Sequence, residues 1–269
     1  MKKFLLWCVF LLPVQAIKAE ESASENALID VLQRAEAAYQ RMNSEIRDYT
    51  CILTKRERID GRLQGPESIY LKVRHQQPSG ETIEQPFSVY LRFLHPATVR
   101  DREVLYVQGR HQGKMIVRNG GTILPFITTS LPPDSAAAMQ ESRYPITEIG
   151  VKTLTRRLIE VGLEKLGDDN CEVLVVPGAR INGRYCTMIQ VGHRERREDQ
   201  DFHYVRVFID DQLELPVYYV AYDWPRNEGS PSILLEEYTY TDIQLNVGLN
   251  DRDFDHRNGN YLFLKSFIP

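Results

Sequence analysis

The sequence predicts an α+β fold in which a large, curved antiparallel sheet stays unclosed, as a half-barrel, and is covered by helices. Three observations lead to this prediction. Segments of alternating apolar and polar residues recur along most of the chain, as in strands with one buried face. Tight-turn residues separate neighbouring segments, which favours sequential hairpins. Two helical patterns, one N-terminal and one central, interrupt the strands.

The N-terminal segment 1–19 has the pattern of a secretory signal peptide. Lysines precede an apolar stretch at 4–12, and Ala16 or Ala19 supplies a small residue for cleavage. The stretch is too short to span a bilayer, and no later segment is long and apolar enough for a membrane helix. We therefore expect export, to the periplasm or beyond, followed by cleavage. The mature chain, 20–269, should form one domain that is not an integral membrane protein.

Composition excludes one class of partner. The formal charge of the chain is −4, and loss of the three lysines in the leader brings it to −7. Acidic and basic residues are interspersed, without a basic stripe that would attract phosphates. Nucleic acid is therefore not an expected partner.

Apolar residues at helical spacing predict two main helices. The first, over 26–45, should begin after a capping box formed by Ser22 and Glu25 and lie on the sheet. The second, over 147–166, should form the central lid. Its apolar stripe consists of Val151, Leu154, Leu158 and Val161. Asp134 is expected to cap a short helix ahead of the lid.

The strands are predicted from alternation and from turns. We expect them at 48–59, 67–75, 87–94, 103–108, 115–117, 172–181, 184–193, 203–209, 213–222 and 233–245. Within the strand at 87–94, one face carries Phe87, Val89, Leu91 and Phe93, and the other carries Ser88, Tyr90 and Arg92. Asp60–Gly61 is the strongest hairpin signal, and Asn182–Gly183 is a second. The polar segment 76–85 is expected to be a mobile loop.

Three cysteines remain in the mature chain, Cys51, Cys171 and Cys186. In an oxidising compartment one pair can form, and the sequence does not decide among the three pairings. If Asn182–Gly183 is a two-residue turn, Cys186 lies opposite Ala179, which is too far from Cys171 for a bond. Buried thiols without a disulfide are the alternative.

Several short motifs are spread over most of the chain. They are Tyr49-x-Cys51, Lys55-x-Glu57-Arg58-x-x-Gly61, Pro86-Phe87-Ser88-Val89-Tyr90, Arg102-Glu103-Val104 with Tyr106 and Gly109, Arg143-Tyr144-Pro145-Ile146 with Gly150, and Asn182-Gly183-Arg184-x-Cys186. Over residues 30–262 the chain resembles an exported bacterial family catalogued as domain of unknown function 1571. That family more distantly resembles the periplasmic lipoprotein carriers LolA and LolB. The LolA-like resemblance implies an unclosed barrel with helices as a lid over an apolar cavity.

The sequence contains no catalytic motif: Gly-x-Ser-x-Gly, His-Glu-x-x-His, Cys-x-x-Cys and a glycine-rich phosphate loop are all missing. The acids of 251–255 have calcium-loop spacing, but the glycine and the bidentate glutamate of such a loop are absent. A turn whose acids accept backbone N–H groups, with Phe254 anchoring the tail in the core, is favoured. His193 and His203 face each other across a hairpin without a third ligand, so no metal and no cofactor are expected.

Lys55 and Glu57 share one face of their predicted strand. Cross-strand pairing with Glu67 or Lys72 explains them structurally. A polar rim at a cavity mouth, or a contact with a partner, is the functional alternative.

Strands that are apolar on both faces favour a binding protein. One face meets the helices, and the other needs a second cover or an apolar guest, because large exposed apolar patches are rare on monomers. We therefore expect a non-enzymatic carrier that holds a lipid, a lipoprotein acyl chain or another apolar guest between sheet and helices. The candidate contacts are Phe87, Val89, Leu91 and Phe93 on the sheet and Leu154 and Leu158 on the lid. An ordinary packed core is the alternative explanation.

Two other functions stay open. An envelope interaction or sensor module would bind a partner protein through a strand edge or through the polar loops at 76–85 and 224–231. A hydrolase or metalloenzyme has no supporting group of residues and is the weakest of the three hypotheses.

Overall fold

The computed structural model describes residues 14–79, 82–122, 126–198 and 200–263. The strands are β1 Asp48–Ile59, β2 Arg62–Leu63, β3 Glu67–Arg74, β4 Gln77–Ser79, β5 Thr82–Gln85, β6 Ser88–His95, β7 Glu103–Val107, β8 Met115–Arg118, β9 Thr128–Leu131, β10 Cys171–Ile181, β11 Arg184–His193, β12 Tyr204–Asp210, β13 Pro216–Asp223 and β14 Ile233–Leu245. The helices are α1 Val14–Glu45, α2 Ala136–Met139 and α3 Val151–Glu164, with 3-10 turns η1 His111–Gly113, η2 Ile146–Glu148 and η3 Asp251–Phe254.

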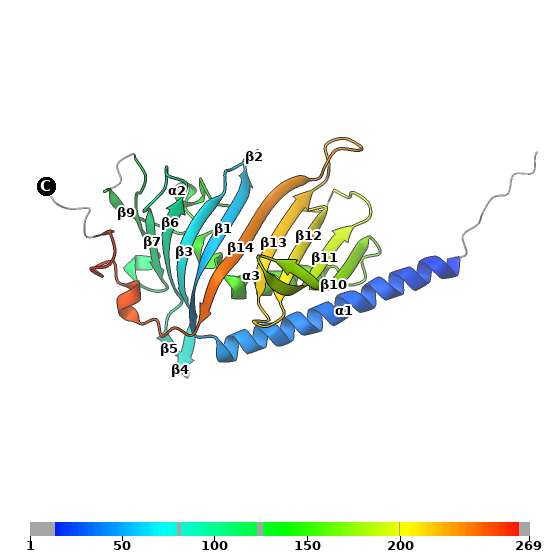
Figure 1. Ribbon diagram of the computed structural model, residues 1–269, viewed down its shortest axis with the longest axis horizontal. Coiled ribbons are helices and arrows are strands. Elements are labelled where there is room, and N and C mark those ends of the chain that lie inside the picture. Colours follow the sequence, from blue (N-terminus) through cyan, green and yellow to red (C-terminus); the bar gives the residue numbers. More distant parts are fainter. Residues whose placement is uncertain (1–13, 80–81, 123–125, 199, 264–269) are drawn as a thin grey trace, which may run out of the picture.

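One antiparallel sheet of 12 strands organises the fold (Figure 1). Its strand order is β10-β11-β12-β13-β14-β1-β3-β6-β7-β8-β9, with β2 paired to β1 alone. The sheet is curved and unclosed, because β10 and β9 form its two edges. In the view of Figure 1, α3 lies behind the strands, and α1 runs under the β10 end of the sheet and beyond it. The expected α+β fold class is confirmed.

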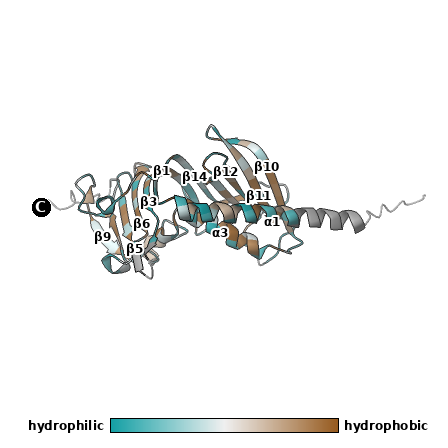
Figure 2. Cartoon of the chain, turned by 90° about the horizontal axis from the view of Figure 1, so that it is seen from below, coloured by the Kyte–Doolittle hydropathy of each residue, from teal (hydrophilic) through white to brown (hydrophobic). Residues whose placement is uncertain are grey.

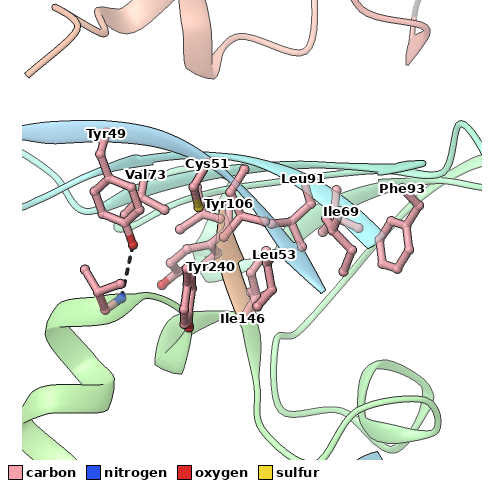
Figure 3. Packing of buried hydrophobic residues seen from close by; sticks show 14 of the residues in the cluster. Tyr49, Cys51, Leu53, Ile69, Val73, Leu91, Phe93, Tyr106, Ile146 and Tyr240 are labelled. Carbon is pink, nitrogen blue, oxygen red and sulfur yellow. Dashed lines mark hydrogen bonds between the residues drawn. The ribbon is translucent and has the colours of Figure 1, made fainter. Parts of the chain in front are cut away.

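Alternation along the strands gives the sheet two different faces. On β6, Val89, Leu91 and Phe93 belong to a buried cluster on the face toward α3, which we call the inner face. Tyr90 belongs to a separate cluster on the outer face. The alternation predicted for this strand is thereby confirmed. Figure 3 shows side chains of the inner cluster between the strands and the helical segments.

The C-terminal segment 251–263, which we call the strap, covers part of the outer face. Its Phe254, Tyr261 and Phe263 pack against a buried cluster from β6, β7 and β8. The carboxylate of Glu103 on β7 accepts hydrogen bonds from the Tyr90 hydroxyl at 2.7 Å and from the Leu262 N–H at 2.8 Å. The predicted anchoring of the tail by Phe254 is confirmed, and η3 begins with a capping box instead of a metal loop.

The two predicted hairpin turns are present. Asp60 and Gly61 have φ values of 49° and 75°, and Asn182 and Gly183 have 48° and 79°. Left-handed φ at both central positions matches the twist of the flanking strands, and glycine adopts it without a steric penalty. As predicted from the second turn, Cys186 lies opposite Ala179 in the register of β10 and β11. Cys51 and Cys186 are buried thiols.

The first helix differs from its prediction in its start and in its packing. It begins at Val14, so Ser22 and Glu25 lie inside the helix and not ahead of it. Residues with high helix propensity continue through this region, and no breaker separates them from the amphipathic part. Its packing extends further than predicted: Leu28 and Leu32 contact α3 and the edge strand β10, and Met42 and Ile46, at and just after the other end of the helix, pack in the inner-face cluster of the sheet. Residues 1–13 of the predicted signal peptide lie outside the described residues, and cleavage stays a prediction.

Two further boundaries were predicted wrongly. The segment expected as a mobile loop contains the hairpin β4–β5, with residues 80–81 outside the described residues. These strands are too short for alternation to reveal them. Ser135, and not Asp134, is the N-cap of α2, since its Oγ accepts a hydrogen bond from the Ala138 N–H at 3.3 Å.

Candidate functional site

A cavity of about 580 Å³ lies between the inner face and its helical cover. Its floor comes from the central and β9-side strands of the sheet and from β12–β14, and its cover from the segment 133–161. Seen from below in Figure 2, α1 crosses in front of the strands with α3 beside it, and apolar residues colour much of α3. Small-molecule sites in proteins span roughly 300–1,000 Å³, so the cavity has the size of a ligand site.

The floor of the cavity is mainly apolar. Its apolar side chains include Leu53, Ile69, Leu91, Phe93, Val104 and Met115. Of the four contacts predicted on β6 and just before it, Leu91 and Phe93 line the cavity. Val89 is wholly buried in the inner core, and Phe87 packs against that core; neither lines the cavity.

The cover of the cavity includes one side of α3. Leu154 and Leu158 line the cavity and are partly buried, and the exposed Val161 also lines it, so both lid residues predicted as contacts lie at the site. The predicted stripe is divided between two sides of α3, because Val151 belongs to the buried side together with Thr155 and Ile159. These residues lie about a quarter-turn away on the helix, where α3 meets α1. The helix therefore has two apolar sides, one for packing and one for the cavity.

The start of α3 is fixed to the sheet by a tyrosine. The Tyr49 hydroxyl accepts a hydrogen bond from the Val151 N–H at 3.2 Å, which satisfies one of the free donors at the helix start (Figure 3). Gly150 precedes the helix at φ 110°, and a Cβ built there would meet the Tyr49 hydroxyl at 2.5 Å. Only glycine allows this approach. The predicted helix over 147–166 is consequently broken into η2 and α3.

Two glutamates face each other on the central strands of the floor. Glu57 on β1 and Glu236 on β14 are direct partners in the register, and each is 4 % exposed. The Tyr238 hydroxyl bridges them, at 2.6 Å from Glu57 and 3.2 Å from Glu236. Tyr219 donates a further hydrogen bond to Glu236 at 3.2 Å. A buried like-charged pair needs such donors and nearby cations, because desolvation otherwise makes it costly.

The cations come from β1 and from the segment 141–144, which connects α2 with η2. Lys55 Nζ lies 3.0 Å from Glu57 and 3.4 Å from Glu67. Arg143 Nε lies 2.9 Å from Glu236. The predicted pairing of Lys55 with Glu67 is confirmed, and the same pair forms part of a polar rim along the cavity.

The segment 141–144 is held against the sheet by this network. The Arg143 N–H donates to Glu57 at 3.3 Å, and the Tyr144 hydroxyl donates to Glu236 at 3.1 Å. Lys55 donates to the Glu141 carbonyl at 3.3 Å. Each contact joins the cover to a central strand, so the two glutamates hold the cover in place.

Burial raises the pKa values of the acidic side chains in this network. It raises the pKa of the Glu236 carboxyl, an effect that Arg143 and Tyr144 oppose and Glu57 reinforces. Burial and the neighbouring carboxylates also raise the pKa of the Tyr219 and Tyr238 hydroxyls. The tyrosines therefore remain protonated hydrogen-bond donors.

Sequence reasoning missed Glu236, Arg143 and Tyr144 as members of the site. Glu236 and Glu57 are paired only through the contact between the first and last long strands, which no local pattern reveals. Arg143 and Tyr144 stand in one of the motifs quoted for the family resemblance, but their type and spacing do not indicate burial.

The described residues do not point to a metal site or a membrane span. No group of three or more His, Cys, Asp and Glu side chains among them is arranged to hold a metal ion. His193 and His203 are joined through their backbones, with the His193 N–H donating to the His203 carbonyl at 2.9 Å. None of the helices within the described ranges combines the length and apolar character that crossing a bilayer requires.

The family comparison agrees with the motifs. The model of a family described as "Protein of unknown function (DUF1571)" matches residues 46–263. No curated protein matches the chain.

Solved structures of low sequence identity share parts of the fold. The Mycobacterium tuberculosis lipoprotein LppX is 15 % identical, with a TM-score of 0.43 over 86 % of this chain and 99 % of that one. A LolA superfamily protein from Nitrosomonas europaea is 9 % identical, with a TM-score of 0.33 over 82 % and 97 %. In the Pseudomonas aeruginosa MucA/MucB complex, the matched chain is 13 % identical, with a TM-score of 0.44 over 82 % of this chain and 60 % of that one.

Proposed function

The chain belongs to the DUF1571 family, and from this premise we propose that it is a binding protein which holds an apolar guest, such as a lipid or a lipoprotein acyl chain, in the cavity under α3. The observation that carries the proposal is the cavity itself, of about 580 Å³ and walled by apolar side chains of the sheet and the cover. An unfilled apolar space of this size costs packing energy, which a guest would restore at about 25 cal/mol per Å² of buried apolar area.

The floor and the cover differ in a way that suits guest exchange. Leu53 and Ile69 on the floor are wholly buried on strands paired on both sides. Leu158 on the cover is only partly buried, and its helix is attached at one end by the Tyr49 hydrogen bond. Local opening draws on the parts of a fold with the fewest buried contacts. The cover would therefore open at the cavity-facing side of α3, while the sheet and the attached segment 141–144 keep their positions.

The polar network supports binding over catalysis. The carboxylates of Glu57 and Glu236 accept hydrogen bonds from tyrosines and pair with cations, so their capacity is taken up by the protein. Burial also raises the pKa of Tyr238, which keeps its hydroxyl protonated. A catalytic base or nucleophile needs a reactive form that can reach a substrate. We propose that the protein is not an enzyme and acts after export.

Recovery of the guest tests the proposal. The full chain is expressed in a bacterial host with its leader, purified from the envelope without detergent, and extracted for mass spectrometry of bound lipid. Binding is then measured with the neutral apolar dye N-phenyl-1-naphthylamine. We expect a co-purified lipid that the dye displaces. Repeated purification without lipid, together with the absence of dye binding, would contradict the proposal.

A pair of variants on α3 locates the binding site. Leu158→Trp fills the cavity from the cover and is expected to reduce dye affinity at least about tenfold by occupying the space of the guest. Leu163→Trp adds the same side chain at a position that is 53 % exposed and does not line the cavity, so it serves as the control. Equal dye binding by both variants would place the guest elsewhere.

Recognition of a partner protein is the second candidate function. On the outer face, Phe208 and Tyr218 form an edge-to-face pair on β12 and β13, and Leu174 on β10 is 50 % exposed. No described element packs over these strands on that face. If this surface serves a partner, Phe208→Ser should abolish capture of one stoichiometric protein, and Leu158→Trp should leave it intact. The opposite result would assign the partner to the cavity.

A further inference from the structure

We propose that the guest is an amphiphile with a cationic, hydrogen-bond-donating head of the ammonium type, and that the cavity rejects anionic amphiphiles. The inference rests on the proposed function and names the chemical class of its ligand. It follows from how the charged side chains of the cavity wall are paired with one another, which decides the kind of head group the wall can accept.

The cationic side chains of the wall already have anionic partners. Each of them lies in an ion pair with a carboxylate of the same wall, and the wall carries six acidic side chains against these four basic ones. The pairs are Lys55–Glu57 at 3.0 Å, Arg143–Glu236 at 2.9 Å, Arg157–Glu148 at 3.2 Å, and Arg102–Glu141. An anionic head would have to compete with one of these carboxylates for its cation.

Two of the wall carboxylates have no capacity left for a guest. Glu57 accepts hydrogen bonds from Tyr238, from Lys55 and from the Arg143 N–H. Glu236 accepts from Tyr144, Tyr219 and Tyr238 and also pairs with Arg143. These two residues hold the cover in place and are not available to bind a head group.

Glu67 and Asp201 are the two wall carboxylates outside these four pairs, and only Glu67 is partly buried, since Asp201 is exposed. The ion-pair partner of Glu67 among the described residues is Lys55, at 3.4 Å, and Lys55 lies closer to Glu57 and also donates to the Glu141 carbonyl and to Ser142 Oγ. Burial raises the pKa of the Glu67 carboxyl, Lys55 and Arg102 oppose this effect, and Glu141 adds to it. Lys55 pairs with both Glu57 and Glu67, so one positive charge serves two carboxylates. A cationic head that donated hydrogen bonds to Glu67 would supply the second positive charge.

The position of Glu67 also suits the head of an amphiphile. Glu67 begins β3, and Ile69, two residues along, lies on the same face and lines the apolar floor. Its side chain is 18 % exposed, so the carboxylate lies between the floor and water. A chain lying along Ile69 and Phe93 would bring its head to this carboxylate. The surplus negative charge, in a poorly solvated recess, attracts a cation and repels an anion.

Three single-chain amphiphiles of equal length test the inference. Dodecylammonium, dodecanol and dodecanoate are titrated, below their aggregation limits and at neutral pH, against the full chain loaded with N-phenyl-1-naphthylamine. We expect dodecylammonium to displace the dye at a concentration roughly tenfold lower than dodecanol, and dodecanoate to be the weakest competitor. The ranking with the unmodified protein decides the matter even if every variant fails to fold.

Substitutions of Glu67 assign the preference to one carboxylate. Glu67→Gln removes the negative charge and is expected to abolish the advantage of dodecylammonium over dodecanol. Glu67→Asp retains the negative charge, so the advantage of dodecylammonium should remain. Glu237→Gln is the matched control. Glu237 lies on β14, on the outer face of the sheet and away from the cavity, where it accepts a hydrogen bond from the Tyr218 hydroxyl at 2.7 Å. A change of ranking in this control would overturn the assignment to Glu67.

The outcomes separate this inference from the proposed function. Equal displacement by the three amphiphiles, or tightest binding of dodecanoate, would overturn the inference and leave the binding function standing. Failure of the dye to bind, with no heat of binding for any of the three by calorimetry, would overturn the proposed function as well.

Discussion

His75 at the end of β3 makes folding stability depend on pH. Its side chain is buried against Tyr49, and its ring Nδ1 lies 2.8 Å from the Ile46 carbonyl, to which it donates. Burial lowers the pKa of His75 to about 4; the hydrogen bond to Ile46 opposes this shift, and the nearby Lys152 adds to it. The folded protein therefore holds a neutral imidazole over a pH range in which the unfolded chain holds a charged one.

We expect stability to fall as the pH is lowered from about 6.5 to about 4. Above the ordinary pKa of 6.5 neither state is protonated, and below it only the unfolded state gains a proton, so unfolding becomes more favourable. The loss attributable to this residue is at most about 3 kcal/mol. Urea unfolding at a series of pH values measures it. His75→Gln keeps a donor for the Ile46 carbonyl but cannot titrate, so its free energy of unfolding should depend less steeply on pH between about 4 and 6.5. An unchanged pH dependence would exclude His75 as the cause.

At the scale of an element, the two apolar sides of α3 should respond differently to a charge. Ile159→Asp buries a carboxylate between α3 and α1, where Ile159 is 8 % exposed, and should cost several kcal/mol. Leu158→Asp places the same group toward the cavity, from which it can reach water, and should cost about 1 kcal/mol while abolishing dye binding. Thermal melts of the two variants measure the difference. Unfolding of both would show that α3 is a fixed part of the core.

The attachment of the segment 141–144 to the sheet should weaken when the Tyr144 hydroxyl is removed. In Tyr144→Phe the hydrogen bond to Glu236 is lost, and hydrogen bonds to charged groups contribute roughly 1.5–3 kcal/mol. We expect the Arg143 amide, which donates to Glu57, to exchange with deuterium at least about tenfold faster. Hydrogen exchange with mass spectrometry measures this rate.

Tyr218→Phe is the control for that experiment. It removes the same group from the outer face, where the Tyr218 hydroxyl donates to Glu237 at 2.7 Å. Exchange of the Arg143 amide should not change in this variant. Equal acceleration in both variants would mean that general destabilisation, and not release of the cover, is being measured.

Local patterns predicted most strands of the fold, because alternation and turn chemistry are properties of neighbouring residues. The predicted strand 48–59 coincides with β1, and Asn182–Gly183 forms the predicted turn. The helix α3 was harder, since a helix with two apolar sides has no single stripe for periodicity to find. The pairing of Glu57 with Glu236 could not be predicted at all, because register between distant strands is set by the completed sheet.

At the scale of the molecule, the strap joins the end of the chain to strands formed near its beginning. Phe254 is 1 % exposed and packs with Tyr90, Leu105 and Val107, and the Arg74 guanidinium lies 4.8 Å above its ring. Phe254→Ala should destabilise the whole fold by about 3–5 kcal/mol. Denaturant unfolding measures this value. Phe126→Ala, at a position that is 53 % exposed, should change stability by less than about 0.5 kcal/mol.

If Phe254→Ala releases the strap but leaves the denaturant midpoint of global unfolding unchanged, the role given to the strap is contradicted. It would mean that residues 251–263 detach before the sheet unfolds. In that case limited proteolysis should release a C-terminal fragment from the native protein, because detached segments are the first to be cleaved.

The strand order has a consequence for the timing of folding. From β1 to β9 the sheet grows by successive neighbours, and from β10 to β14 it does so again, so each half can assemble from nearby residues. The halves meet only where β1 pairs with β14, and this closure over a long sequence separation is the slow kind of step. The cavity floor and its facing glutamates straddle that seam. Under the proposed binding function, the chain therefore has no complete cavity for a guest until β14 has paired with β1.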